Sequence, residues 1–330
     1  MKGKPALYAA TGFLLAFTAF AQTHGDVSPV HDPAIIRQGS RWYVFATNQF
    51  DRKDVPQFCS PDLKEWKFCG HVFDGVPAWA LQKLPGARGI WAPDVSFAHG
   101  EYRLYYAVST FGSNHSVIGL TTNKTLDPES PDYRWNDHGL VLESNVPGGT
   151  ADDFNAIDPN LLQTPSGAMW LAFGSFWDGI KMRSIDPETG KLSSADTKLY
   201  SLASRRPNQT AIEAPFLVHH DSYYYLFVSF DRCCRGKDST YKIMVGRAPE
   251  PTGPYLDRGG KPMLEGGGTL LMEGNDVWKG PGGQSIFSSP DGDVMTYHAY
   301  DGVDGRAVLH ISTLTWENGW PLASVLPNTK

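Results

Sequence analysis

Apolar and polar residues follow one another in short, strand-like runs along most of the chain. Residues 41–47 (RWYVFAT), 102–109 (YRLYYAVS) and 223–229 (YYYLFVS) are rich in aromatic and β-branched side chains. Gly, Pro, Asn and Asp residues separate these runs, as expected of strands joined by turns. The i, i+3, i+4 spacing of an amphipathic helix is almost absent. The pattern predicts an all-β fold.

One sequence pattern occurs five times. Each copy has a proline near its start, a short apolar strand, a Gly, Asp or Ser turn, and an aromatic strand. Consecutive copies start 60, 65, 55 and 69 residues apart, which leaves room for four strands in each. Such repeats predict a five-bladed β-propeller that forms one domain over residues 22–330, because a stacked solenoid uses much shorter repeats. The five copies begin at His31, Trp91, Ala156, Ala211 and Gly280.

The first strand of each blade lines the central axis of a propeller, so the residues that open the five copies are expected to meet there. Glu213 stands before Ala-Pro, and Asp32 and Asp158 stand directly before Pro. We expect these three acids to be counterparts. Trp91 aligns with Glu213, and the fifth copy has glycines at this position.

Three carboxyl groups at one end of the axis have a chemical consequence. Burial and like charge raise the pKa of at least one of them, while another stays ionised. Glycoside hydrolysis uses such a pair, one as acid and one as base or nucleophile. Asp-Pro and Glu-Ala-Pro are also ordinary turn signals. Three acids at equivalent repeat positions favour a catalytic site.

Aromatic residues near the same end are candidates for stacking against sugar rings. Trp91 is the strongest, because it aligns with a candidate catalytic position, and Phe111 and Trp177 follow the second strands of their blades. A single aromatic residue in an aromatic-rich protein more often packs in the core. Asp94 follows its proline instead of preceding it, so we interpret it as structural.

Residues 1–21 have the features of a secretory signal peptide. Lys2 and Lys4 precede an apolar run that ends at Ala19-Phe20-Ala21, a small-x-small cleavage pattern. A membrane anchor is the alternative, but the run is short and lacks a stop-transfer flank. We expect secretion after cleavage near Ala21, no membrane association and a monomer.

Charge and composition narrow the choice of partner. Loss of Lys2 and Lys4 takes the formal charge from −6 to −8, and no basic cluster stands out, so nucleic acid is excluded as a partner. Aromatic residues make up 12% of the chain, which suits neutral polar ligands such as sugars. The sequence leaves open whether Cys59 and Cys69 form a disulfide, and whether the adjacent Cys233 and Cys234 do.

Five motifs together resemble family 43 of the glycoside hydrolases, and within it the secreted endo-1,5-α-L-arabinanases. The resemblance covers almost the whole mature chain, with the motifs in the same order. The motifs are VHDPAIIRQGSRWYVFATN, GIWAPDVSF, FNAIDPNLL, AIEAPFLVHHDSYYYLFVS and TYHAYDG.

The resemblance implies a five-bladed propeller enzyme that inverts the anomeric centre. It implies that Asp32 is the general base, that Glu213 is the general acid, and that Asp158 tunes and orients Glu213. It also implies a largely water-coordinated calcium ion faced by His298. The chain departs from the family at Gly283, where many relatives have a histidine after Gly-Pro-Gly.

Three functions remain to be distinguished. The first is cleavage of arabinan or arabino-oligosaccharides from plant cell walls. The second is a β-xylosidase or α-L-arabinofuranosidase of the same family, which the absence of room for an extra β-sandwich after the fifth blade disfavours. The third is a carbohydrate-binding propeller without catalysis, which would not need three axial acids. The sequence does not decide between endo and exo action.

Overall fold

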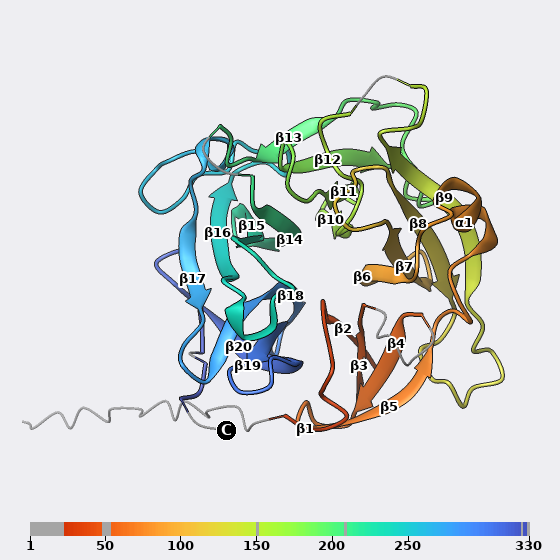
Figure 1. Cartoon of the computed structure of the whole chain (residues 1–330), viewed down its shortest axis with the longest axis horizontal. Coiled ribbons are helices and arrows are strands. Elements are labelled where there is room, and N and C mark those ends of the chain that lie inside the picture. Colours follow the sequence, from red (N-terminus) through yellow and green to blue (C-terminus); the bar gives the residue numbers. More distant parts are fainter. Residues whose placement is uncertain (1–22, 48–53, 150–151, 208–209, 325, 329–330) are drawn as a thin grey trace, which may run out of the picture.

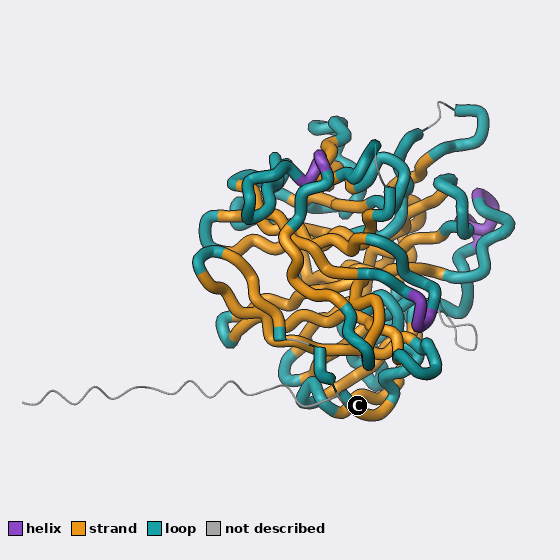
Figure 2. The backbone as a smooth tube through the Cα atoms, turned by 60° about the vertical axis from the view of Figure 1, so that its left-hand side comes forward, coloured by secondary structure: helices purple, strands orange, loops and turns teal. Residues whose placement is uncertain are grey.

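The structure is a computed structural model that describes residues 23–47, 54–149, 152–207, 210–324 and 326–328. Five antiparallel sheets stand around a central axis as the blades of a propeller (Figure 1). Strands dominate the chain trace, and the described residues contain only three short helical segments (Figure 2). The all-β, five-bladed prediction is confirmed, while the expected signal peptide at residues 1–21 lies outside the described residues.

The strands follow one another outward through each blade, from the axis to the rim. Blade 1 contains β2 (Ala34–Gln38), β3 (Arg41–Phe45), β4 (Pro56–Ser60), β5 (Glu65–His71) and, parallel to β5, the short β1 (His24–Gly25). Blade 2 contains β6 (Ile90–Ala98), β7 (Glu101–Val108), β8 (Ser116–Asn123) and β9 (Asn136–Ser144). Blade 3 contains β10 (Asn160–Gln163), β11 (Met169–Phe173), β12 (Ile180–Ile185) and β13 (Tyr200–Ala203).

The remaining elements complete the ring. Blade 4 contains β14 (Ile212–His220), β15 (Tyr223–Phe230), β16 (Lys242–Ala248) and β17 (Thr269–Glu273). Blade 5 contains β18 (Trp278–Ser289), β19 (Gly292–Asp301), β20 (Ala307–Glu317) and β21 (Trp320–Ala323). The helical segments are α1 (Ala78–Lys83), η1 (Gly236–Asp238) and η2 (Met263–Glu265). None of the described helices is long and apolar enough to span a bilayer.

The apolar core consists of five clusters, each between two neighbouring blades. The cluster between blades 3 and 4, for example, joins Leu162 and Met182 to Ile212 and Leu226, all buried. Complete burial of one such side chain contributes about 1.5–3 kcal/mol to stability. Because each cluster needs two blades, the blades stabilise one another around the ring.

Hydrogen bonds near the axis also join each blade to the next. A side chain of one blade bonds a backbone N–H of its neighbour at all five junctions, so the inner strands are held in fixed register. Asp94, interpreted as structural from the sequence, provides one of these bonds. The pairs are Thr47–Ala92, Asp94–Leu161, Asn160–Leu217, Ser229–Gly283 and Ser285–Ile35.

The first described residues close the ring between blades 1 and 5. Thr23 Oγ1 donates to the carbonyl of Leu309 (2.8 Å), and the Val30 amide donates to the carbonyl of Ala307 (3.1 Å). β1 meanwhile pairs with β5 in blade 1. The segment thus bonds both blades on either side of the closure.

Candidate active site

The chain makes the same turn at the axis in every blade. Asp32, Ala92, Asp158, Ala214 and Gly283 all have left-handed backbone angles, with φ between 41° and 59°. Four of these residues are not glycine, and a positive φ is uncommon for them. The first four directly precede a proline. Such conformations persist where the surrounding structure enforces them, often at functional sites.

This turn corrects the expected alignment of the three acids. Asp32 and Asp158 occupy the turn position itself, so their counterpart in blade 4 is Ala214. Glu213 lies one residue earlier and aligns with Trp91, as expected, and with His31. The sequence alignment was wrong by one residue because it matched carboxyl groups near prolines, and residue types do not show which residue turns.

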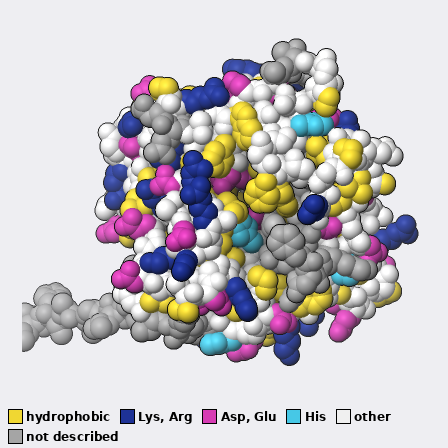
Figure 3. Space-filling view, viewed as in Figure 1, with side chains coloured by type: hydrophobic (Ala, Val, Ile, Leu, Met, Phe, Trp, Pro, Cys, Tyr) yellow, Lys and Arg dark blue, Asp and Glu magenta, His cyan; other side chains and the backbone are white. Residues whose placement is uncertain are grey.

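All three acids nevertheless lie at the axis. A cavity of about 30 Å³ lies between the inner strands, and its lining includes Asp32, Asp158 and Ala214, the residue that follows Glu213. This is about the volume of one water molecule. Figure 3 shows a histidine near the centre of this face of the molecule, with hydrophobic and acidic side chains close to it.

Asp32 is held in its ionised form. Its Oδ2 accepts a hydrogen bond from Thr47 Oγ1 (2.6 Å) and lies 2.8 Å from His31 Nδ1. Burial, the largest single effect, would raise the pKa of the carboxyl. The charge and hydrogen bond of His31 and the hydrogen bond of Thr47 act in the opposite direction, and the net effect holds the pKa of Asp32 well below its usual range. Burial would likewise lower the pKa of His31, but the charge and hydrogen bond of Asp32 raise it.

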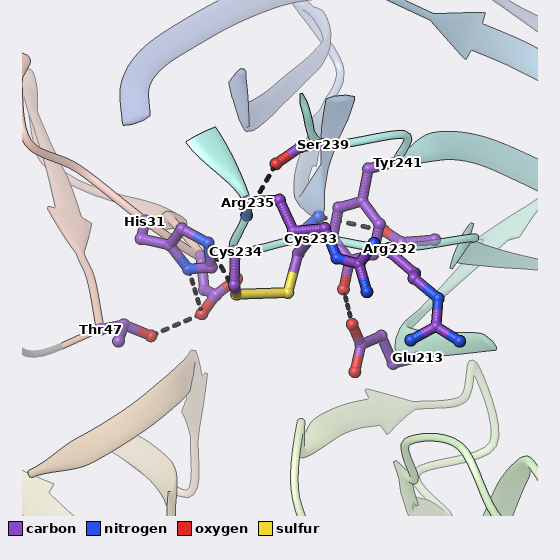
Figure 4. The surroundings of a disulfide bond; sticks show 12 residues. His31, Thr47, Glu213, Arg232, Cys233, Cys234, Arg235, Ser239 and Tyr241 are labelled. Carbon is purple, nitrogen blue, oxygen red and sulfur yellow. Dashed lines mark hydrogen bonds and ion pairs between the residues drawn. A yellow bond between two sulfur atoms is a disulfide. The ribbon is translucent and has the colours of Figure 1, made fainter. Parts of the chain in front are cut away.

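Glu213 is buried and has two hydroxyl donors. Ser175 Oγ donates to Oε2 (2.5 Å), and Tyr241 Oη donates to Oε1 (Figure 4). Burial raises the pKa of Glu213, and the charge of Asp32 raises it further. The two hydroxyl donors act in the opposite direction, because they stabilise the ionised form. The net effect is a raised pKa.

Asp158 lies next to Glu213 through the backbone of blade 4. Its Oδ2 accepts a hydrogen bond from the amide of Ala214, the residue that follows Glu213 (3.0 Å). Burial raises the pKa of Asp158 well above its usual value, and the charges of Glu213 and Asp32 add to this effect. Glu213 and Asp158 therefore titrate as a pair that keeps a proton more readily than an isolated carboxyl group.

Four residues that hold these carboxyls were not recognised from the sequence. They are His31, Thr47, Ser175 and Tyr241. His31 had a signal, since it directly precedes Asp32 in the His-Asp-Pro motif. Thr47 and Ser175 had a signal as well, since each is the hydroxyl residue that follows the aromatic strand of its copy, whereas Tyr241 lies just before β16 and belongs to no repeated pattern.

The predicted aromatic residues are only partly brought together. The rings of Trp91 and Phe111 lie 5.0 Å apart, and Phe111 is 82% exposed, so the pair forms an open aromatic surface. Trp177 lies in the loop after β11, two residues beyond Ser175. It is half-buried and has a left-handed φ of 39°.

His298 in β19 has the properties expected of a residue that faces a bound ion or water. It is fully buried, its Nδ1 accepts from the Asp32 amide (3.2 Å), and its Nε2 has no hydrogen-bond partner among the described residues. Burial lowers the pKa of His298 well below its usual value, so the ring is neutral. Nitrogen or oxygen atoms of His31, Asp32 and His298 lie within 4.8 Å of one another.

Gly283 packs closely against the two residues at this point. A Cβ atom there would lie 2.6 Å from Asp32 Oδ1 and 2.9 Å from His298 Nδ1, closer than real contacts allow. Glycine, at a position where many relatives have histidine, therefore lets the backbone approach Asp32 and His298 closely. The carboxylate of Asp32 at a small cavity, with an imidazole beside it, fits a hydrated hard cation.

The fold and the site together define a class of protein: propeller glycoside hydrolases with carboxyl groups at the central axis. Residues 28–321 match the model of glycosyl hydrolases family 43, and the chain belongs to this family. The resemblance seen in the sequence is confirmed.

Several relatives match over most of their length. The extracellular endo-α-(1→5)-L-arabinanase 1 of Bacillus subtilis is 45% identical over 294 residues, 88% of this chain and 87% of the relative. The extracellular exo-α-(1→5)-L-arabinofuranosidase ArbA of Cellvibrio japonicus is 41% identical over 303 residues, 88% and 85% of the two chains. The solved family 43 endo-arabinanase from Bacillus licheniformis is 44% identical, with a TM-score of 0.83 over 92% of this chain and all of the other.

Proposed function

We propose that this chain is a glycoside hydrolase that cleaves the α-1,5 linkages of arabinan or arabino-oligosaccharides with inversion, from within the polymer. Family membership and the arabinan-cleaving relatives support the substrate class. The observation that carries the mechanism is the division of the axial carboxyls. Neighbouring groups lower the pKa of Asp32, whereas burial raises that of Glu213.

In this mechanism Asp32 is the general base. Its Oδ2 is engaged by Thr47 and His31, so Oδ1 is the oxygen that takes a proton from the attacking water. As the water oxygen bonds to the anomeric carbon, the glycosidic C–O bond breaks. Glu213 then gives its proton to the leaving sugar oxygen, so the site ends with a protonated Asp32 and an ionised Glu213.

Asp158 acts on the acid. It holds the amide of Ala214 and thereby the backbone that presents Glu213. Burial raises the pKa of both Glu213 and Asp158, and the charge of Glu213 raises that of Asp158 further, so the pair retains a proton more readily than an isolated carboxyl group. Trp91 and Phe111 offer the sugar an apolar surface, and Trp177 extends the proposed contacts toward blade 3.

We also propose that a calcium ion, coordinated mostly by water, binds beside His298 and Asp32. The cluster of His31, Asp32 and His298, whose nitrogen or oxygen atoms lie within 4.8 Å of one another, supports this site. Such an ion would supply a fixed positive charge near Asp32. The Asp32 amide donates a hydrogen bond to Nδ1 of His298, so the proton of the neutral ring lies on Nε2. A water molecule that accepts a hydrogen bond from this Nε2–H is therefore the competing occupant of the site.

Secretion is part of the proposal. The Bacillus subtilis and Cellvibrio japonicus relatives are both named extracellular. The basic and apolar residues 1–21 match a signal peptide that is cleaved near Ala21.

A substrate screen tests the function directly. Purified protein is incubated with debranched arabinan, branched arabinan and xylan, and product sizes are followed over time, with the Asp32→Asn variant as a matched control for contaminating activity. We expect debranched arabinan to be cut first into mixed oligosaccharides, as endo cleavage requires. Release of a single small product from the start would mean exo cleavage. Cleavage of xylan alone, or binding without hydrolysis, would refute the proposed function.

A further inference from the structure

The loop between β15 and β16, residues 231–241, carries the Cys233–Cys234 disulfide beside the site. Cys233 is half-buried and Cys234 is exposed. The sulfur of Cys234 lies 3.8 Å from Nε2 of His31. In the view of Figure 4 the disulfide lies between the His31 ring and the Glu213 side chain. The hydrolysis proposed above makes no chemical use of either sulfur, which raises the question of what the disulfide does there.

A continuous set of contacts leads from this disulfide to the base. The amide of Cys234 donates a hydrogen bond to Tyr300 Oη (2.9 Å). Tyr300 Oη lies 2.7 Å from Nε2 of His31, and Nδ1 of the same ring lies 2.8 Å from Asp32 Oδ2. The position of the Cys234 amide therefore bears on the orientation of the imidazole that contacts Asp32.

The backbone at Cys234 needs support to keep this position. Its φ is +63°, in the left-handed region that non-glycine residues rarely adopt. The bond to Cys233 closes a small ring of atoms around the peptide between the two residues and so restricts its rotation. The amide of Arg235 bonds Ser239 Oγ (3.0 Å) and anchors the next residue of the loop. The disulfide is thus the covalent restraint on the Cys234 peptide itself.

We propose that the Cys233–Cys234 disulfide positions the general base, by holding the Cys234 amide against Tyr300 and so His31 against Asp32. The inference rests on the proposed function, because it requires Asp32 to act as base. Both cysteines are positioning residues. Once the disulfide is broken, the backbone at Cys234 can return to a negative φ, which turns its amide away from Tyr300.

Reduction of this one bond is the test. A Cys59→Ala/Cys69→Ala background leaves two of the four cysteines, so the vicinal bond is the only disulfide that can form within the chain. A phosphine gives two electrons to the S–S bond, which becomes two thiols, while water supplies two protons and the oxygen of the phosphine oxide. We expect kcat on debranched arabinan to fall about tenfold, the scale of an orienting contact to a reacting group, with KM within about twofold.

Reoxidation and a second variant separate positioning from general damage. Oxidised glutathione should restore both the disulfide, counted by thiol titration, and kcat. The Tyr300→Phe variant breaks the same set of contacts as Cys233→Ser/Cys234→Ser. When the two changes are combined, kcat should therefore fall no further than in either variant alone, and the two fold-losses in kcat should not multiply. The unreduced Cys59→Ala/Cys69→Ala protein is the matched control, and we expect its kcat to equal that of the parent protein.

The outcomes are distinct. An unchanged kcat after confirmed reduction overturns the inference. So does a combined variant in which the separate fold-losses in kcat multiply. A raised KM with constant kcat would mean that the sulfurs contact the sugar and do not position the base. If the oxidised protein itself does not hydrolyse arabinan, the proposed function fails, and the positioning role fails with it.

Discussion

Replacement of Tyr241 by phenylalanine removes one of the two hydroxyl donors to Glu213 and keeps the ring. The donor and acceptor are both buried, at 4% and 7% exposure, so water does not replace the lost bond. Burial and the charge of Glu213 raise the pKa of Tyr241 well above its usual value, so its hydroxyl keeps its proton and donates. The bond stabilises the ionised carboxylate, and its loss must therefore raise the pKa of the acid.

The size of the effect follows from the bond. A hydrogen bond to a charged group contributes about 1.5–3 kcal/mol. Roughly 1.4 kcal/mol corresponds to one pH unit in a pKa. In the pH profile of kcat/KM, the acidic limb belongs to the base and the alkaline limb to the acid, which must be protonated. We expect the alkaline limb of Tyr241→Phe to lie about one to two pH units higher, with the acidic limb unchanged.

The assay is kcat/KM on debranched arabinan across the pH range in which the protein stays folded. Tyr255→Phe is the matched control, because Tyr255 is also buried in blade 4 and donates its hydroxyl to the carbonyl of Pro251, away from the carboxyls. Its pH profile should equal that of the parent protein. If the alkaline limb of Tyr241→Phe stays at the same pH or moves to lower pH, the assignment of Glu213 as the acid is refuted.

Three further predictions follow from the site and the fold. Glu213→Gln and Asp32→Asn should each lose about 10²- to 10⁴-fold in kcat on arabinan, and an aryl arabinoside whose leaving group needs no proton should rescue only Glu213→Gln; rescue of Asp32→Asn instead would reverse the two roles. Chelation, with loss of the metal confirmed by elemental analysis, should lower activity, and added calcium should restore it. Unchanged activity would refute a catalytic role for the ion and would mean that a water molecule occupies the site beside His298. Cys59→Ala/Cys69→Ala removes a disulfide between two residues that are ten positions apart in the sequence. Urea denaturation should show a free energy of unfolding that is lower by about 2–3 kcal/mol, and kcat should stay unchanged.

The blades could be predicted because their signals repeat. A proline-led strand, a turn and an aromatic strand recur five times, and each copy gave the innermost two strands of a blade. The three axial acids were found for the same reason, since each stands within two residues of such a proline. The offset between Glu213 and the two aspartates was missed because it depends on which residue adopts a left-handed φ.

The partners of Glu213 could not be predicted, because they come from distant parts of the chain. Ser175 is 38 residues from Glu213 and Tyr241 is 28 residues away, and no pattern in the sequence pairs either of them with Glu213. The sequence did not decide whether either pair of cysteines forms a disulfide, for a related reason. Pairing depends on where the sulfurs lie, and the structure pairs Cys59 with Cys69 and Cys233 with Cys234.

The stereochemistry of the product shows directly whether Asp32 activates water while Glu213 protonates the leaving group. The two residues belong to blades 1 and 4, which are not adjacent in the ring. This placement favours the separation of about 6.5–9.5 Å that an inverting pair needs over the roughly 5–5.5 Å of a retaining pair. Proton NMR in the first minutes of arabinan hydrolysis, before mutarotation, shows which anomer is released. We expect a β-configured reducing end first, and an initial α product would overturn the assignment of Asp32 as general base by making one of the carboxylates a nucleophile.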